Sequence, residues 1–245
     1  MIADVLTVAR KEWTEYIATG TGLKGGRMGL IVMLAVFGVF LPAQNGPTWL
    51  TSPIPLVMWA WVPLMLVSGV VADSFAGERE RHTLETLLAS RLSDEAILLG
   101  KVGAATVYGW AFAVLAAALS VVSVNVFHWQ GHAVFFPAAV ATALPVFSLL
   151  TSLLAASAGV LVSLRAPTAR HAAQALSISV MVILFVPMFT IRALPEDTRN
   201  ALAAAALRFD ARALMAAAAL GMLLVDGALL AAGFLRFRRS RLTLD

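Results

Sequence analysis

The sequence predicts an all-α membrane protein, a single domain over residues 1–245, whose chain crosses the bilayer as six transmembrane helices. Three observations lead to this prediction. The chain is 60% hydrophobic and only 13% charged, whereas soluble domains carry roughly 25% charged residues. Its apolar residues gather in segments close to the ~20 residues that cross a bilayer. Lys and Arg residues fall mainly on alternate loops, as they do in membrane proteins of fixed orientation.

The first element, residues 1–19, is expected to be an amphipathic helix at the cytoplasmic membrane interface. Its apolar residues recur at helical spacing, but its other side is too polar for the helix to span. Trp13 and Tyr16 are expected at the level of the lipid headgroups. A helix that packs on a soluble partner would show the same pattern. The glycine-rich stretch 20–26 then ends the helix before the chain enters the bilayer.

Six apolar segments follow and are the predicted spans. They are residues 28–43, 54–72, 102–127, 134–164, 173–191 and 214–235. The fourth contains Pro137 and Pro145, so we expect this helix to be kinked or broken. A broken helix is tolerated inside a membrane only where protein or water satisfies the freed backbone groups.

The basic residues predict which side of the membrane each loop faces. With the N-terminus in the cytoplasm, most Lys and Arg residues lie inside, and the outer loops 44–53 and 128–133 contain none. The basic residues left outside are Arg192, Arg199, Arg208 and Arg212. This asymmetry favours six spans with both termini in the cytoplasm. It is the arrangement expected of a multi-pass protein of the cell (plasma or inner) membrane.

The loop of residues 73–101, DSFAGERERHTLETLLASRLSDEAILLGK, holds many of the charges of the chain. Gly77 is expected to separate it from the second span, and a short helix is expected from Glu78 to Ala89. Ser93 is a suitable N-cap for the helix that follows. The apolar stripe of the short helix consists of Leu84, Leu87, Leu88 and Leu92. Since so short a helix is marginal by itself, the stripe needs either the membrane interface or a partner protein. A solvated loop with chance periodicity is the third alternative.

This 73–101 loop resembles the cytoplasmic loop of type-2 ATP-binding-cassette (ABC) transporter permeases. The residues that carry the resemblance are Ser74, Phe75, Gly77, Glu78, Thr83, Leu84, Glu85, Leu87, Leu88, Ser93, Gly100 and Lys101. The RKEW stretch at 10–13 is similar to the interfacial helix that opens these permeases. Arg91 departs from the pattern, because the family often has proline there.

The resemblance implies that the loop is a coupling helix, which sits in a groove of a separate ATPase subunit. In that contact Leu84, Leu87 and Leu88 would be buried, with Glu78, Arg81 and Glu85 around them. The resemblance also implies an export-type permease that pairs with a second permease subunit, as a homodimer or heterodimer, among membrane lipids. ATP and Mg would be bound by the partner ATPase, and no cofactor by this chain.

The sequence indicates no catalytic site of its own. It contains no G-x-x-x-x-G-K-[ST] motif, so we expect no P-loop and no ATPase activity in this chain. His128 and His132 have no carboxylate nearby and the chain has no cysteine, so no metal site is predicted. No basic stripe with interleaved aromatic residues predicts nucleic-acid binding. A membrane-embedded enzyme is therefore a weak alternative, and a non-transporting receptor or assembly factor is the other.

Asp226 is the acidic residue that lies deep within a predicted span. Carboxylates are costly inside a membrane and usually face the interior of the helix bundle. Asp226 is therefore a candidate for the substrate pathway or a proton relay. The alternative is a structural hydrogen bond to a neighbouring helix or to the second subunit. Asp73, at the end of the second span, is expected to pair locally with an arginine.

Overall fold

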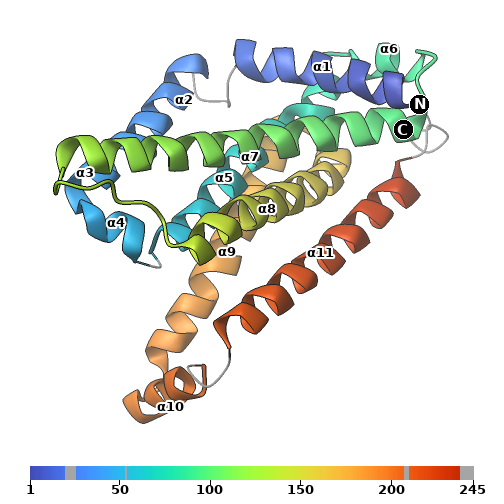
Figure 1. Ribbon diagram of the computed structural model, residues 1–245. Coiled ribbons are helices and arrows are strands. Elements are labelled where there is room, and N and C mark those ends of the chain that lie inside the picture. Colours follow the sequence, from blue (N-terminus) through green and yellow to red (C-terminus); the bar gives the residue numbers. More distant parts are fainter. Residues whose placement is uncertain (20–25, 53, 207–209, 238–245) are drawn as a thin grey trace.

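The computed structural model describes residues 1–19, 26–52, 54–206 and 210–237, and these fold into helices with no strand among them (Figure 1). Within that part, five segments are long and apolar enough to cross a membrane. They are Met28–Asn45, Asp94–Phe127, Ala138–Arg165, Ala169–Ala193 and Arg212–Arg236. The prediction of an all-α, multi-pass membrane protein is thus confirmed. A sixth crossing would be α5 (Ile54–Glu80), which forms one helix over the second predicted span but is not among the five.

The first crossing combines α2 (Gly26–Ala35), a π-helical turn η1 (Val36–Phe40) and α3 (Leu41–Asn45). A π-turn disturbs the regular backbone ladder, and here Ser123 donates a hydrogen bond of 3.0 Å to the carbonyl of Val39. The chain then reverses at Gly46, whose φ of +60° suits glycine, and enters the short helix α4 (Pro47–Thr51).

The centre of the molecule is α8 (Ala138–Arg165), which packs against α5, α7 (Asp94–Phe127) and α11 (Ala211–Arg236). A Cβ atom on Gly109 of α7 would overlap Val67 of α5 and lie 2.8 Å from the hydroxyl of Ser152, so glycine permits this close approach. α8 is unbroken across Pro145, although Pro137 precedes its first residue. The indole of Trp110 donates a hydrogen bond of 3.0 Å to the Pro145 carbonyl.

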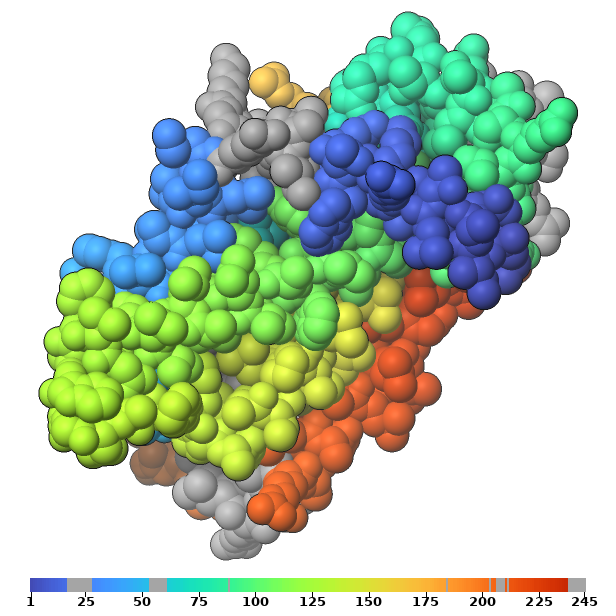
Figure 2. Space-filling view, turned by 45° about the horizontal axis from the view of Figure 1, so that its top comes forward, coloured from blue at the N-terminus to red at the C-terminus, as the bar shows by residue number. Residues whose placement is uncertain are grey.

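The N-terminal helix α1 (Ile2–Thr19) packs against the beginning of α7, and Figure 2 shows it alongside the 73–101 loop. Val8, Glu12 and Tyr16 face inward, whereas Ile2 and Leu6 are exposed. The helix itself is confirmed, and Tyr16, which was expected at the level of the lipid headgroups, is covered by other parts of the chain. Its ring is buried 5.6 Å from that of Tyr108 on α7, because packing against α7 takes the face centred on Val8, Glu12 and Tyr16.

The remaining helices lie at the edge of the bundle. α9 (Ala169–Ala193) contacts mainly α5, and α10 (Glu196–Ala206) follows it as a short, exposed helix. α11 contacts mainly α8 and diverges from α9 along its length (Figure 1). Large apolar side chains are exposed on both long helices, among them Ile183, Phe189, Leu220 and Leu224. Lipid or another membrane helix is the natural surrounding for such faces.

Candidate functional site

The 73–101 loop differs from its predicted course. α5 continues through Gly77 to Glu80, and the expected helix from Glu78 to Ala89 is interrupted by a turn at His82, whose φ is +56°. Of the expected helix, the part beyond the turn is helical over α6 (Leu84–Leu88). The predicted N-cap is present, because the Ser93 hydroxyl accepts a hydrogen bond of 3.2 Å from the backbone of Ala96.

The turn is fixed by an ion pair on the outside of α5. Arg81 reaches back to Asp73 with a nitrogen–oxygen distance of 3.0 Å, which confirms the local pairing expected for Asp73. The hydrogen bond to Asp73 raises the pKa of Arg81. A Cβ at position 77 would overlap the Asp73 carboxylate, so Gly77 leaves room for the pair rather than ending the helix.

The six residues expected at the ATPase contact are not all on the surface. Arg81 and Glu85 are exposed, and Leu87 is half-buried. Leu84 instead packs into the core of the chain itself, with 7% of its surface exposed. The side chain of Leu88 lies outside the described part. Leu87 and Leu92 pack partly buried against the same core, so the apolar stripe faces the interior of the chain rather than outward.

Glu78 requires the larger correction. It was expected on the rim of a protein contact, but it is 4% exposed and belongs to a buried ion cluster. The ion cluster comprises Lys11, Glu12, Glu78 and Lys101. The Lys101 ammonium lies 2.8 Å from Glu12 Oε1 and 3.0 Å from Glu78 Oε1. Lys11 lies 2.7 Å from the same Glu78 oxygen and 3.3 Å from Glu12.

Lys101 is enclosed on every side, with 1% of its surface exposed. Besides the two carboxylates, its ammonium donates a hydrogen bond of 2.9 Å to the Ser74 carbonyl and lies 5.0 Å from the centre of the Phe75 ring. Lys101 thus donates hydrogen bonds to Glu12 and to the Ser74 carbonyl, pairs ionically with Glu78 and makes a cation–π contact with Phe75. A charge buried this deeply persists only when paired and hydrogen-bonded, and Lys101 meets both conditions.

The cluster perturbs the titration of its members on α1. Burial alone would raise the pKa of Glu12, but the charges and hydrogen bonds of Lys101 and Lys11 outweigh it and hold that pKa below its usual value. Burial would lower the pKa of Lys11, yet the hydrogen bond to Glu78 and the neighbouring carboxylates raise it. Burial raises the pKa of Tyr16, and the negative charge of Glu12 adds to the effect. Glu12 and Lys11 are therefore held in their charged forms.

The ion cluster joins three segments that are distant in sequence: α1 through Glu12, the end of α5 through Glu78 and the start of α7 through Lys101. A movement of the 73–101 loop would displace Glu78 and Lys101, which lie in it, and act on α1 through Glu12. The ion cluster therefore couples the position of the 73–101 loop to those of α1 and α7. It does not bring together groups for acid–base or nucleophilic chemistry.

Sequence reasoning missed Glu12 and the pairing of Lys101. A local signal for Glu12 existed, because it sits four residues from both Val8 and Tyr16 on the face that packs against α7. A carboxylate in the middle of an apolar helix face indicates a buried cation nearby. Which cation it meets depends on contacts between residues 89 positions apart, and no spacing rule identifies those.

Asp226 lies on the face of α11 that packs against α8 and is 1% exposed. Neither carboxylate oxygen has a hydrogen-bond partner among the described residues, and the same holds for the hydroxyl of Ser157 on α8. Gly109 of α7 lies next to Ser152 of α8, and Gly233 of α11 lies next to Leu98 of α7. These two contacts define the positions of α8 and α11 along the axis of α7. At 1.5 Å per residue, these contacts put Asp226 and Ser157 at about the same depth.

Comparisons with known proteins bear on the whole of this geometry. A family model described as "ABC-2 family transporter protein" matches residues 53–209. The match includes the 73–101 loop, α8 and α9, and it begins after the first crossing. A search among curated proteins finds no match.

Proposed function

Since the chain belongs to the ABC-2 transporter family, a family of membrane transport subunits, we propose that it is the permease subunit of an ABC exporter. A separate ATPase subunit would hydrolyse ATP with Mg, and this chain would move the substrate. The observation that carries the proposal is the ion cluster. It ties the 73–101 loop to α1 and α7, so that a push on the loop reaches two helices at once.

The contact with the ATPase subunit is formed by the outer side of the turn and α6. Arg81 and Glu85 are available there, and the half-buried Leu87 supplies an apolar edge, to which Leu88 adds by its place in the sequence. A short helix that inserts into a groove of a partner is a common mode of recognition. Leu84 and Glu78 act from behind this surface by fixing α6 and the ion cluster.

The chain has six spans, with α5 as the second, and both termini lie in the cytoplasm. Two permease subunits frame one pathway between them. The exposed apolar faces of α9 and α11 support contacts with lipid and a second subunit. Asp226 belongs to the substrate pathway, because its buried carboxylate has no partner among the described residues and is available to an incoming group.

The topology is tested by labelling, which the absence of cysteine makes simple. A cysteine at Ser90, in the 73–101 loop, is expected to resist a membrane-impermeant maleimide in intact cells and to react after lysis. Labelling of the Ser90→Cys variant in intact cells would contradict the orientation.

The partner contact is tested by co-purification of the ATPase with the tagged permease. Each buried leucine contributes roughly 1.5–3 kcal/mol, so Leu87→Ala with Leu88→Ala is expected to weaken association at least about tenfold. The matched control is Leu115→Ala with Val122→Ala, two exposed apolar residues of α7 that lie outside the faces of α9 and α11. Unchanged co-purification of the first variant, with the permease still folded, refutes the coupling contact.

Substrate-stimulated ATP hydrolysis separates a transporter from a receptor or assembly factor of the same fold. The complex in lipid vesicles is expected to hydrolyse ATP faster when a transported compound is added. A complex that assembles but never responds to any substrate class would favour the receptor.

A further inference from the structure

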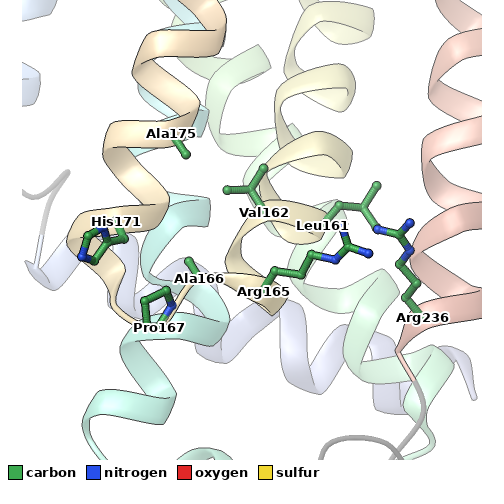
Figure 3. Close-up of a pocket in the computed structure, with 8 residues that line it drawn as sticks. All are labelled: Leu161, Val162, Arg165, Ala166, Pro167, His171, Ala175 and Arg236. Carbon is green, nitrogen blue, oxygen red and sulfur yellow. The ribbon is translucent and has the colours of Figure 1, made fainter.

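A pocket of about 440 Å³ lies between the ends of α8, α9 and α11 (Figure 3). Two of its lining residues are Arg165 and Arg236, the last residues of α8 and α11. In Figure 3 their side chains extend toward each other across the gap between the two helices. His171, on the first turn of α9, and Pro167 close the pocket on the other side. The pocket is distinct from the ion cluster and from Asp226.

Arg165 and Arg236 have no acidic partner among the residues that the structure describes. Neither forms an ion pair or a hydrogen bond with the rest of the chain as far as the structure describes it. The nearby Glu80 accepts a hydrogen bond of 3.3 Å from the backbone of Ala169. Arg79 adds positive charge on the α5 side, where it donates to the carbonyls of Leu164 and Ala166. Two guanidinium groups that converge without a carboxylate favour an anion between them.

The rest of the lining is apolar and is ordered along the helices. Leu161 and Val162 lie about one turn before Arg165, and Ala175 lies one turn beyond His171. The cationic groups therefore stand at the helix ends, and the apolar wall lies one turn deeper toward the centre of the spans. This polarity is that of a phospholipid, with its phosphate at the membrane surface and its acyl chains in the hydrocarbon.

We propose that this pocket binds the phosphate headgroup of an anionic phospholipid in the leaflet next to the ends of α8 and α11. Basic pockets between transmembrane helices bind such headgroups elsewhere. Arg165 and Arg236 hold the phosphate, and Leu161, Val162 and Ala175 contact the upper part of an acyl chain. A lipid here bridges α11, which packs mainly on α8, to α9. The inference needs neither the ATPase subunit nor the identity of the substrate.

The experiment is native mass spectrometry of the full-length permease in its assembled state, from micelles that contain equal amounts of phosphatidylglycerol and phosphatidylcholine. Wild type is expected to retain phosphatidylglycerol preferentially. The variant Arg165→Gln with Arg236→Gln is expected to lose that preference by about tenfold or more, since each basic group adds to the attraction. The matched control is Arg192→Gln with Arg212→Gln, exposed arginines of α9 and α11 at their opposite ends, which leaves the preference intact.

One further variant and one competitor test the apolar wall and the need for acyl chains. Ala175→Trp fills the apolar wall but keeps both arginines, and it is expected to release the lipid even if the double variant fails to fold. Glycerol phosphate, which carries the same anionic group without acyl chains, is expected to compete poorly. An equal preference in wild type and the double variant, lipid retained in Ala175→Trp, or efficient displacement by glycerol phosphate each overturns the lipid site.

Discussion

Two buried polar regions of this protein differ in how their charges are satisfied. In the ion cluster, the ammonium of Lys101 has two carboxylates and a backbone carbonyl within 3.0 Å. Asp226 is as deeply buried but has no partner for either oxygen in the described part of the chain. A well-paired buried network rigidifies the structure around it, although Glu78 Oε2 has no hydrogen-bond partner in the described part of the chain. A buried polar group without partners costs free energy that the folded chain does not recover.

This difference distinguishes a paired cluster of charges from a carboxylate that has no partner among the described residues. The cluster joins α1, α5 and α7 and contributes to the fold as well as to any movement of the 73–101 loop. Asp226 has no hydrogen-bond partner in the described part of the chain, so no contact seen there requires a carboxylate at this position. Its retention in an apolar helix is understandable if something that is not part of this chain binds there. The comparison therefore predicts opposite consequences for substitutions at the two sites.

The largest effect is expected from removal of the central cation. Lys101→Met leaves the buried carboxylates of Glu12 and Glu78 with only Lys11, whose side chain is 42% exposed, as a shared cation. Breaking a buried pair costs about 3–5 kcal/mol. The free energy of unfolding of the purified permease, measured by titration with a denaturing detergent, is expected to fall by that amount.

The control keeps the volume and removes all three charges. Lys101→Met combined with Glu12→Gln and Glu78→Gln is expected to recover much of the loss, because neutral groups in the same space need no counter-ion. If the free energy of unfolding of Lys101→Met falls by less than about 1 kcal/mol, the ion cluster does not stabilise the contact between α1, α5 and α7.

The second prediction concerns acid. The folded pKa of Glu12 is lowered by Lys101 and Lys11 against the effect of burial. Its contribution to stability is therefore fully present above the ordinary glutamate pKa of about 4.5 and is lost as the pH falls through the lowered folded value. Wild type is expected to lose stability relative to Glu12→Gln as the pH is lowered from about 5 to 3. Parallel pH profiles for the two proteins would contradict the assignment.

The third prediction uses an exposed pair in the same loop to show that burial, rather than charge itself, sets the effect. Arg81 and Asp73 are 3.0 Å apart, but each side chain is about half exposed. Exposed pairs contribute up to about 1 kcal/mol, so Arg81→Ala is expected to lower stability by no more than that. The difference from wild type is expected to vanish in high salt. If Arg81→Ala lowers the free energy of unfolding as much as Lys101→Met does, burial does not set the size of the effect.

The two regions also differ in what their sequence could reveal. Asp226 is visible as a carboxylate in an apolar run, and Ser93 as a cap, because both signals are local. The ion cluster depends on Glu12, Glu78 and Lys101 meeting from three helices, which only tertiary packing decides. The same holds for Leu84, whose helical spacing correctly indicates an apolar face but not whether that face meets a partner or the core. The turn at His82, a positive-φ residue other than glycine, had no sequence signal.

The smallest effect on stability, and the most informative one, is expected at Asp226. Asp226→Asn keeps the shape and replaces a buried ionisable group that has no partner among the described residues, so the free energy of unfolding is expected to change by less than about 1 kcal/mol or to rise slightly. Substrate-stimulated ATP hydrolysis is expected to be lost, because the carboxylate is proposed to bind an incoming group. Both quantities are measured on the same preparation.

Ser157→Ala is the matched control for Asp226→Asn, since its hydroxyl is buried at about the same depth and also lacks a partner. It is expected to leave stability unchanged and to weaken stimulation less than Asp226→Asn, because it removes no charge. If Asp226→Asn instead destabilises the fold by several kcal/mol, the carboxylate has a structural partner in the assembled transporter. The contrast between the paired ion cluster and the carboxylate of Asp226 would then not hold. Asp226 would instead be a structural residue, as Glu12 and Glu78 are.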